Sequence, residues 1–401
     1  MAVKRRPDEA PTDPLGLSGL LASKEILVTC GSGGVGKTTT AAAAAAVAAV
    51  EVGGRVLVLT VDPARRLATA LGLQELGNTE VRVSDEAWDA AGVKPRGELW
   101  AAMLDTKASW DELVRLHAPD EATCEAILHN PLYQNITGKF VQSHDYIAME
   151  RLYEIHQSGR YDLIIVDTPP TRNAIDFLEA PERMADFFSS RLLRWLIAPS
   201  RSRMVTAASR PFYTVADRIL GSQFLEDIAE FFILFQALYD GFVERANAVT
   251  RLLNDPRTAF VVVTTLEPEP AREAGFFIDE LAARDLSLGG VVANKVLPEA
   301  LLVGDNQRLA RCLVERPDSI AEHLTTAAPD LGEVASLARM LAEVGDSFAN
   351  FSAVARREAE LRTGLARHAV PVVPVPYLDD DVSDLGGLLD LGAALWGRRT
   401  A

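Results

Sequence analysis

The sequence is poor in cysteine, with only Cys30, Cys124 and Cys312 among 401 residues. An odd and scattered set of this kind predicts neither a disulfide framework nor a CxxC zinc site, and it is typical of proteins in a reducing compartment. The six histidines are equally uninformative, because none of them falls in an HxxxH or HExxH spacing. The common zinc-hydrolase motifs are therefore excluded.

Basic residues are also in deficit, since 56 acidic residues face 40 basic ones and give a formal charge of −16. A field of this sign repels nucleic acid and anionic lipid, so we expect neither as a partner. No run of about 18 uncharged apolar residues is present to span a membrane. The alanine-rich run at 38–50 is better explained as a buried helix. The composition predicts a soluble, cytoplasmic protein without stable membrane insertion.

The first residues, MAVKRRPDEAPTDPLG, are polar where a signal peptide would be apolar. We therefore predict a flexible N-terminal arm over residues 1–22 and a folded domain over 23–401. Short, continuously apolar runs recur in that domain between long helical patterns, as strands covered on both faces do. This predicts an α/β fold, a mainly parallel sheet wrapped by helices. The expected strands are Ile26–Cys30, Val56–Val61, Leu99–Leu104, Leu163–Val166, Phe260–Thr265, Gly290–Ala293 and Val370–Val375.

Two long stretches without strand patterns interrupt this alternation. The first is a predicted helical subdomain at about 182–256, and the second is a helical stretch at about 298–368. Each carries an amphipathic stripe. These stripes either pack on their own domain or form an exposed groove or oligomer surface, and the sequence leaves both open. Their residues are Phe224, Ile228, Phe231, Phe235, Leu238 and Phe242 in the first, and Leu337, Leu341, Val344, Phe348 and Phe351 in the second.

The most specific motif is the Gly31–Thr38 segment, GSGGVGKT, which satisfies the P-loop (Walker A) pattern G-x4-G-K-[ST]. It follows an expected strand and opens an expected helix, which is the context that phosphate binding requires. Glycines let backbone N–H groups converge on phosphate oxygens at the positive end of the helix. Lys37 is expected to reach the β- and γ-phosphates, and the Thr38 hydroxyl is expected to bind Mg²⁺.

Two aspartates end neighbouring expected strands. Asp167, in YDLIIVDTPP, occupies the position of a Walker B aspartate and is the second expected Mg²⁺ ligand. Asp62, in VLVLTVDPA, can face the same crevice and orient or deprotonate the attacking water. The other interpretation of Asp62 is a helix N-cap before Pro63. We predict Asp62 and Lys37 as the catalytic residues.

The order of these motifs, GSGGVGKTTT, VDPA and DTPPT, resembles that of the deviant-Walker (SIMIBI-class) P-loop ATPases. Within that class the chain is most similar to the ArsA/GET family of arsenical-pump and tail-anchored-protein-targeting ATPases, over about residues 24–397. The resemblance implies a dimeric switch that binds ATP and Mg²⁺, hydrolyses ATP and changes a helical partner or client surface. It also implies that Asn294 reads the adenine and that the loop at Pro376 closes over the base. The full predicted nucleotide site is Gly33, Gly34, Val35, Gly36, Lys37, Thr38, Thr39, Asn294 and Pro376.

The chain departs from the family at several positions. Ser32 stands where the family carries a signature lysine that reaches the partner's nucleotide, so we expect a heterodimer with a lysine-bearing paralogue more than a homodimer. Arg65, Arg66 and Arg172 are the alternative cations. The late stretch offers only Cys312, which rules out a dimer-bridging zinc, and three scattered cysteines argue against arsenite as the ligand. The helical subdomain contains only two methionines, Met184 and Met204. Methionine gives an adaptable binding groove, so this scarcity weakens a role in binding a protein client.

Two other functions stay open from the sequence alone. One is a positioning ATPase like those of the MinD/ParA group, which needs membrane or DNA binding, and the acidic charge argues against it. The other is a nucleotide-binding structural subunit with little turnover of its own.

Overall fold

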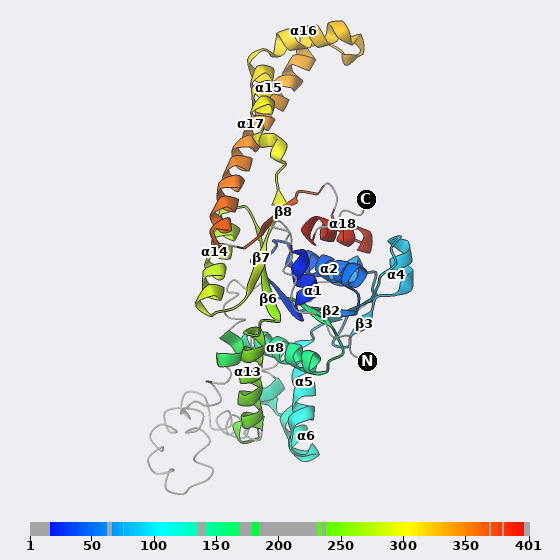
Figure 1. The fold of residues 1–401 in the computed structure, drawn as a ribbon, viewed down its shortest axis with the longest axis vertical. Helices are drawn as coiled ribbons and strands as arrows, with labels where there is room; N and C mark the ends of the chain where they lie inside the picture. Colours follow the sequence, from blue (N-terminus) through cyan, green and yellow to red (C-terminus); the bar gives the residue numbers. More distant parts are fainter. Residues whose placement is uncertain are drawn as a thin grey trace.

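A computed structural model describes residues 17–61, 66–74, 76–134, 141–168, 179–183, 186, 231–234, 238–368, 370–378 and 381–396. Its centre is an eight-stranded sheet of order β3-β4-β2-β5-β1-β6-β7-β8 (Figure 1). Neighbouring strands pair in parallel except β3, which is antiparallel to β4. The predicted mainly parallel sheet is thus confirmed. The strands are Ile26–Cys30 (β1), Arg55–Thr60 (β2), Val81–Arg82 (β3), Glu98–Met103 (β4), Leu163–Asp167 (β5), Thr258–Thr265 (β6), Leu288–Val296 (β7) and Val372–Pro376 (β8).

The central strands are mostly apolar because both faces of the sheet are covered. Every residue of β1, β5 and β6 is buried. Alternate side chains enter two separate cores, so that Ile26 and Val28 contribute to one and Leu27 to the other. Burial of each such side chain stabilises the fold by about 1.5–3 kcal/mol. A helix layer on each face is therefore what this strand pattern requires.

One layer of helices covers each face of the sheet. One layer contains α1 (Ser18–Ser23), α2 (Lys37–Val47), α3 (Arg66–Ala70), α4 (Asp85–Ala90) and α18 (Leu385–Trp396). The other contains α5 (Thr106–His117), α6 (Glu121–His129), α8 (Val141–Gln157), α13 (Tyr239–Leu253) and α14 (Pro268–Ala283). Local signals start several of these helices. The Asp105 side chain, for example, accepts a hydrogen bond of 2.9 Å from the Ala108 N–H and caps α5.

The alanine-rich run forms α2, and its alanines at 41–46 are buried, as the sequence predicted. Small residues are needed there because α18 packs closely on it. A Cβ added at Gly392 of α18 would lie 2.3 Å from Cγ2 of Val47. Among the helices that the structure describes, none is long and apolar enough to cross a membrane.

The predicted N-terminal arm over 1–22 is too long at its C-terminal end. Residues 18–23 form α1, and Leu17 and Leu21 are 1% and 4% exposed. These leucines pack in the same core as α2, so the segment from Leu17 onward belongs to the folded domain. Residues 1–16 lie outside the described residues. So does most of the predicted helical subdomain at 182–256, including Phe224, Ile228, Phe235, Met184 and Met204.

The second predicted helical stretch contains α15 (Gly304–Glu315), α16 (Pro317–Ala327) and α17 (Val334–Leu365). Figure 1 shows these helices extending away from the sheet, beyond the ends of β7 and β8. The C-terminal part of α17 is anchored, since Leu365 lies in a main core and the Glu358 carboxylate accepts a 2.9 Å hydrogen bond from the Leu297 N–H. We call residues 299–357 the helical arm.

Candidate functional site

The loop between β1 and α2 has a backbone conformation that favours glycine at three positions. Gly31, Gly34 and Gly36 have φ values of 145°, 79° and 100°. A Cβ at Gly31 would lie 2.0 Å from the Val263 carbonyl oxygen, and one at Gly36 would lie 2.4 Å from Nδ2 of Asn294. The glycines of the motif therefore allow both the turn and its close contact with β6 and β7.

Lys37 begins α2 and is folded back over this loop. The residue is only 6% exposed. Its ammonium donates hydrogen bonds of 2.9 Å to the Gly31 carbonyl and 2.8 Å to the Ser32 carbonyl. A buried cation needs such acceptors to offset the loss of hydration. The positive charge is thus held at the centre of the loop, where phosphate oxygens bind in P-loop proteins.

Asp167 is brought to the loop by the sheet itself. In the parallel register it lies opposite Thr29 of β1 and Thr60 of β2. Its buried carboxylate accepts hydrogen bonds of 2.7 Å from the Thr38 hydroxyl and 2.8 Å from the Thr60 hydroxyl. Hydroxyl and carboxylate oxygens are ligands that Mg²⁺ prefers, so Thr38 and Asp167 together fit the predicted ion. Thr60 is a neighbour of this site that the sequence did not single out.

The two residues expected to contact the adenine base, Asn294 and Pro376, lie on neighbouring strands. Nδ2 of Asn294, on β7, donates a 2.8 Å hydrogen bond to the Val35 carbonyl of the loop. Pro376 ends β8 and pairs with Val296 of β7, and the following Tyr377 is exposed. The structure thus brings Asn294 to the loop and Pro376 to the adjacent strand end. Contacts of either residue with adenine stay predictions.

The remaining predicted loop residues divide by exposure. Gly33 and Gly34 are exposed, and Thr39 is half-buried. The Val35 side chain is 2% exposed and lies in the core with α2, so only its backbone can face a ligand.

Asp62 lies outside the described residues, and so do Arg65, Arg172 and the side chain of Arg66. The chain that leads to Asp62 is described up to Val61. The Val61 N–H donates a 3.2 Å hydrogen bond to the Asp167 carbonyl oxygen. The described chain therefore reaches Val61 beside Asp167, and the catalytic role of Asp62 stays a prediction.

Ser32 has a partner that the sequence did not indicate. Its hydroxyl donates a hydrogen bond to the carboxylate of Glu273 on α14. No motif marks Glu273, because the contact depends on how α14 packs beside β6.

Nearby, burial raises the pKa of the Cys30 thiol well above its usual value, and Lys37 only partly offsets this. Cys30 is therefore a neutral core residue rather than a nucleophile or a metal ligand.

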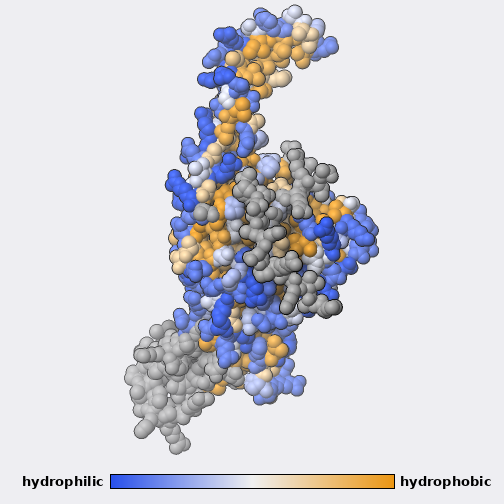
Figure 2. Space-filling model, in the orientation of Figure 1, coloured by the Kyte–Doolittle hydropathy of each residue, from blue (hydrophilic) through white to orange (hydrophobic). Residues whose placement is uncertain are grey.

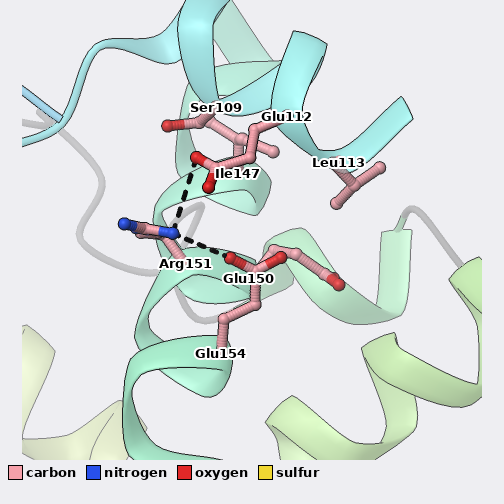
Figure 3. A pocket seen from close by; sticks show the side chains of 7 residues that line it. All are labelled: Ser109, Glu112, Leu113, Ile147, Glu150, Arg151 and Glu154. Atoms are coloured by element: carbon pink, nitrogen blue, oxygen red, sulfur yellow. Dashed lines mark hydrogen bonds and ion pairs between the residues drawn. The ribbon is translucent and has the colours of Figure 1, made fainter. Parts of the chain in front are cut away.

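A second group of ionisable residues lies between α5, α8 and α13. Side-chain atoms of His117, Glu150 and Glu154 lie within 4.8 Å of one another. The two glutamates also line a small pocket (Figure 3). Arg245 already pairs with Glu150, and Arg151 reaches Glu154 at 3.1 Å. Burial raises the pKa of both glutamates and lowers that of His117. Because two arginines already neutralise the carboxylates, we interpret the group as a structural ion-pair network, not as a metal centre.

Comparison with known proteins agrees with this geometry. Residues 24–312 match the family model described as anion-transporting ATPase. The chain is 25% identical over 391 residues to the ATPase BagA of Mycobacterium tuberculosis, covering 94% of this chain and 93% of that protein.

Two further relatives match over shorter parts. An uncharacterized protein of Streptomyces coelicolor is 32% identical over 287 residues, or 69% of this chain and 63% of that protein, so the match spans under two thirds of its length. An ATPase ASNA1 homolog of Leishmania infantum is 30% identical over 222 residues, which are 49% of this chain and 52% of that protein. The family match covers the loop, the Asp167 strand and Asn294 together. The chain belongs to the ArsA family of anion-transporting ATPases, the ArsA/GET group of P-loop ATPases.

Proposed function

We propose that this chain is an ATP-hydrolysing switch that works as a cytoplasmic dimer and couples its nucleotide state to a helical partner or client surface. One observation carries the proposal. The carboxylate of Asp167 lies at the loop that carries the cation of Lys37 and the hydroxyl of Thr38, although 129 residues separate Asp167 from Thr38. Family membership supports nucleotide binding and ATP hydrolysis in general.

Each residue has a distinct task in this proposal. Backbone N–H groups of the loop bind phosphate oxygens, and Lys37 exchanges its two carbonyl partners for the β- and γ-phosphates. Thr38 and Asp167 hold Mg²⁺, which when bound neutralises charge on the phosphates. Asp62 orients the attacking water and accepts its proton. The adenine base is expected to lie between two groups. One is Asn294, which donates a hydrogen bond to the Val35 carbonyl, and the other is the segment at Pro376.

Members of the ArsA/GET family function as dimers. Ser32 cannot supply a charge across such an interface, because a serine is neutral and short and its hydroxyl is bound to Glu273. We propose that the missing charge comes from the lysine of a paralogous subunit or, between two identical chains, from Arg65, Arg66 or Arg172. A trans-acting cation of this kind contributes roughly 10³–10⁵-fold to the rate in related enzymes.

The test is Mg-ATP binding to the purified full chain, measured by calorimetry. Lys37→Ala should remove most of the affinity because it deletes the cation that faces the phosphates. Lys107→Ala is the matched control, since Lys107 pairs with Asp111 on α5 at 2.7 Å and does not touch the loop. Unchanged ATP binding by a folded Lys37→Ala variant would contradict the proposed function.

A further inference from the structure

Helix α17 carries two different apolar faces along the helical arm. The first face consists of small residues and packs against α15. A Cβ added at Gly345 would lie 2.6 Å from the Ala310 carbonyl oxygen, and the Ser352 hydroxyl donates a 2.9 Å hydrogen bond to the Leu301 carbonyl. This face is therefore occupied within the arm.

The second face is exposed. Met340, Val344, Phe351 and Val354 are 60%, 53%, 54% and 50% exposed, and with the exposed Ser347 they follow a 4-3-4-3 spacing. We call these five residues the α17 stripe. Of the seventeen large apolar side chains that are exposed in the described part of the chain, ten lie on the arm, and Figure 2 shows apolar side chains gathered along it. A straight stripe with this spacing is the surface that a second helix covers in a coiled coil.

Charge along one edge of the α17 stripe indicates which helix that is. Glu343, Asn350 and Arg357 succeed one another at intervals of seven residues, so they lie in one row beside the stripe. All three are exposed. Within the described residues neither Glu343 nor Arg357 has an ion-pair partner. The row thus runs from negative through neutral to positive.

We propose that the α17 stripe docks against the α17 stripe of a second copy of this chain, antiparallel, about a twofold axis beside Asn350. In this register Glu343 faces Arg357 of the partner subunit, and Arg357 faces the partner subunit's Glu343. Val344 meets Val354 of the partner subunit, and the large Phe351 meets the partner subunit's small Ser347. The surface is self-complementary, as a twofold interface must be. A parallel pairing would instead set this row against the opposite edge of the stripe, so that Glu343 faces Phe348 of the partner subunit and Arg357 faces the partner subunit's Arg362, which supplies no attractive charge pair.

The position of the axis connects this surface to the nucleotide site. Asn350 lies eight residues from Glu358, where α17 is anchored to Leu297 at the end of β7, or about 12 Å along the helix. The P-loop, Asn294 and the base of the arm all lie at the carboxyl ends of the parallel strands. The antiparallel pairing therefore turns the nucleotide-binding edges of the two copies toward each other. The inference rests on the arm's own residues and not on the proposed ATPase activity, and it favours an identical partner over the paralogue that Ser32 predicts.

The first experiment measures self-association of the full chain without nucleotide by sedimentation velocity over a range of concentrations. Glu343→Arg and Arg357→Glu should each raise the dimer dissociation constant by about tenfold or more, because each places like charges opposite each other twice per dimer. The double variant Glu343→Arg with Arg357→Glu should return to within about threefold of the parent, since the charges are complementary again. Asp346→Arg, on another side of the same helix, is the control and should leave the constant unchanged.

Phe351→Asp should raise the dissociation constant about 100-fold or more, since it removes a central anchor from both copies. Retained Mg-ATP binding by this variant shows that the body is folded. A chain that binds ATP but stays monomeric at all concentrations would overturn the arm proposal and leave the proposed function standing. A dimer that is indifferent to these substitutions, or one that forms only with a paralogue or a membrane, would overturn it as well.

The second experiment places the axis. In a Cys312→Ser background the two remaining cysteines are buried, so an introduced thiol is the only exposed one among the described residues. Asn350→Cys should give a covalent dimer with a short thiol-to-thiol crosslinker, because the two copies of this position face each other. Ala349→Cys, also exposed but turned about 100° around the helix, should not. Equal crosslinking at both positions, or none at 350 in a dimer, would contradict the proposed register.

Discussion

The hydroxyl of Thr38 lies 2.7 Å from a carboxylate oxygen of Asp167, although 129 residues separate the two in the sequence. The contact exists because β5 pairs with β1 in parallel and because α2 starts directly after the loop that follows β1. It places the oxygens of the two predicted Mg²⁺ ligands side by side at the end of the loop that holds Lys37. The expected magnesium site therefore follows from strand register and loop length together.

This contact predicts the effect of Thr38→Val, which keeps the side-chain shape and removes the hydroxyl. We expect the gain in ATP affinity that Mg²⁺ provides to fall by about 10-fold or more, as the loss of a partner at a metal site typically does. Calorimetry with Mg²⁺ and with a chelator measures this gain, and binding without metal serves as the internal control. An undiminished magnesium effect would show that Thr38 is not a ligand.

The loop glycines provide a matched pair of substitutions. Gly36→Ala should weaken ATP binding strongly and cost about 1–3 kcal/mol of stability, because the new Cβ would meet Asn294 Nδ2 at 2.4 Å in a left-handed backbone. Gly34→Ala has a similarly positive φ but nothing within 4 Å of the new Cβ, so it carries the backbone cost alone. ATP affinity and thermal unfolding should both rank Gly36→Ala as the more damaging change. The opposite ranking would mean that contact with Asn294 does not shape the loop.

Position 32 predicts a gain of activity. Ser32→Lys releases Glu273 from its hydrogen bond and restores a cation that can reach across a dimer interface. We expect steady-state ATP hydrolysis of the purified chain to rise by at least about tenfold, a modest part of what a trans-acting cation supplies. Ser32→Gln, similar in length but neutral, is the control. Equal rates for the two variants would show that the missing charge does not limit turnover.

The buried pair of Glu150 and Arg245 governs stability rather than activity. Glu150→Gln should cost about 3 kcal/mol, because it leaves a buried guanidinium without its counter-charge. Replacing both residues, as Glu150→Leu with Arg245→Met, should cost less than the single change. Chemical denaturation measures the free energy of unfolding of the parent, the single variant and the double variant. A double variant that is less stable than Glu150→Gln would mean that the pair itself is strongly favourable.

The same residue predicts a pH effect. Burial, outweighing Arg245, raises the pKa of Glu150 above its usual value of 4.5. A group whose pKa is raised on folding contributes stability at low pH and loses it as the pH rises through the folded value. We therefore expect the free energy of unfolding of the parent chain to fall as the pH rises above about 4.5. The double variant Glu150→Leu with Arg245→Met should lack this decrease.

Sequence patterns were sufficient for the sheet and for the phosphate loop. Seven strands were predicted from short apolar runs, and the runs are clearest in β1, β5 and β6, which are buried on both faces. The eighth, Val81–Arg82, was missed because it is a two-residue exposed edge strand with no such run. Lys37, Thr38 and Asp167 were singled out because the chemistry of phosphate and magnesium binding restricts both residue type and spacing, and the structure brings the three together.

Contacts that depend on packing between distant helices were not predictable. Glu273 meets Ser32 only because of where α14 lies, and Arg245 meets Glu150 only because α13 packs beside α8. For the apolar stripe that the sequence shows on α17, packing and exposure were both left open, and the structure divides its residues between the two. Leu337 is buried, but Val344 and Phe351 are more than half exposed, because Gly345 and Ser352 make the close contacts with α15 and its preceding turn instead. Small residues carry no amphipathic signal, so the sequence could not show which face would be covered.

The most direct test of the account is single-turnover hydrolysis of Mg-ATP by the purified chain, compared with Asp62→Asn. The account predicts that the parent converts bound ATP to ADP and phosphate. Asp62→Asn should bind ATP with unchanged affinity and react roughly 10²–10⁴-fold more slowly, because an amide cannot accept the proton of the attacking water. A parent chain that binds ATP without hydrolysing it, or an Asp62→Asn variant that reacts at the parent's rate, would contradict the assignment of this site as the catalytic centre of an ATPase.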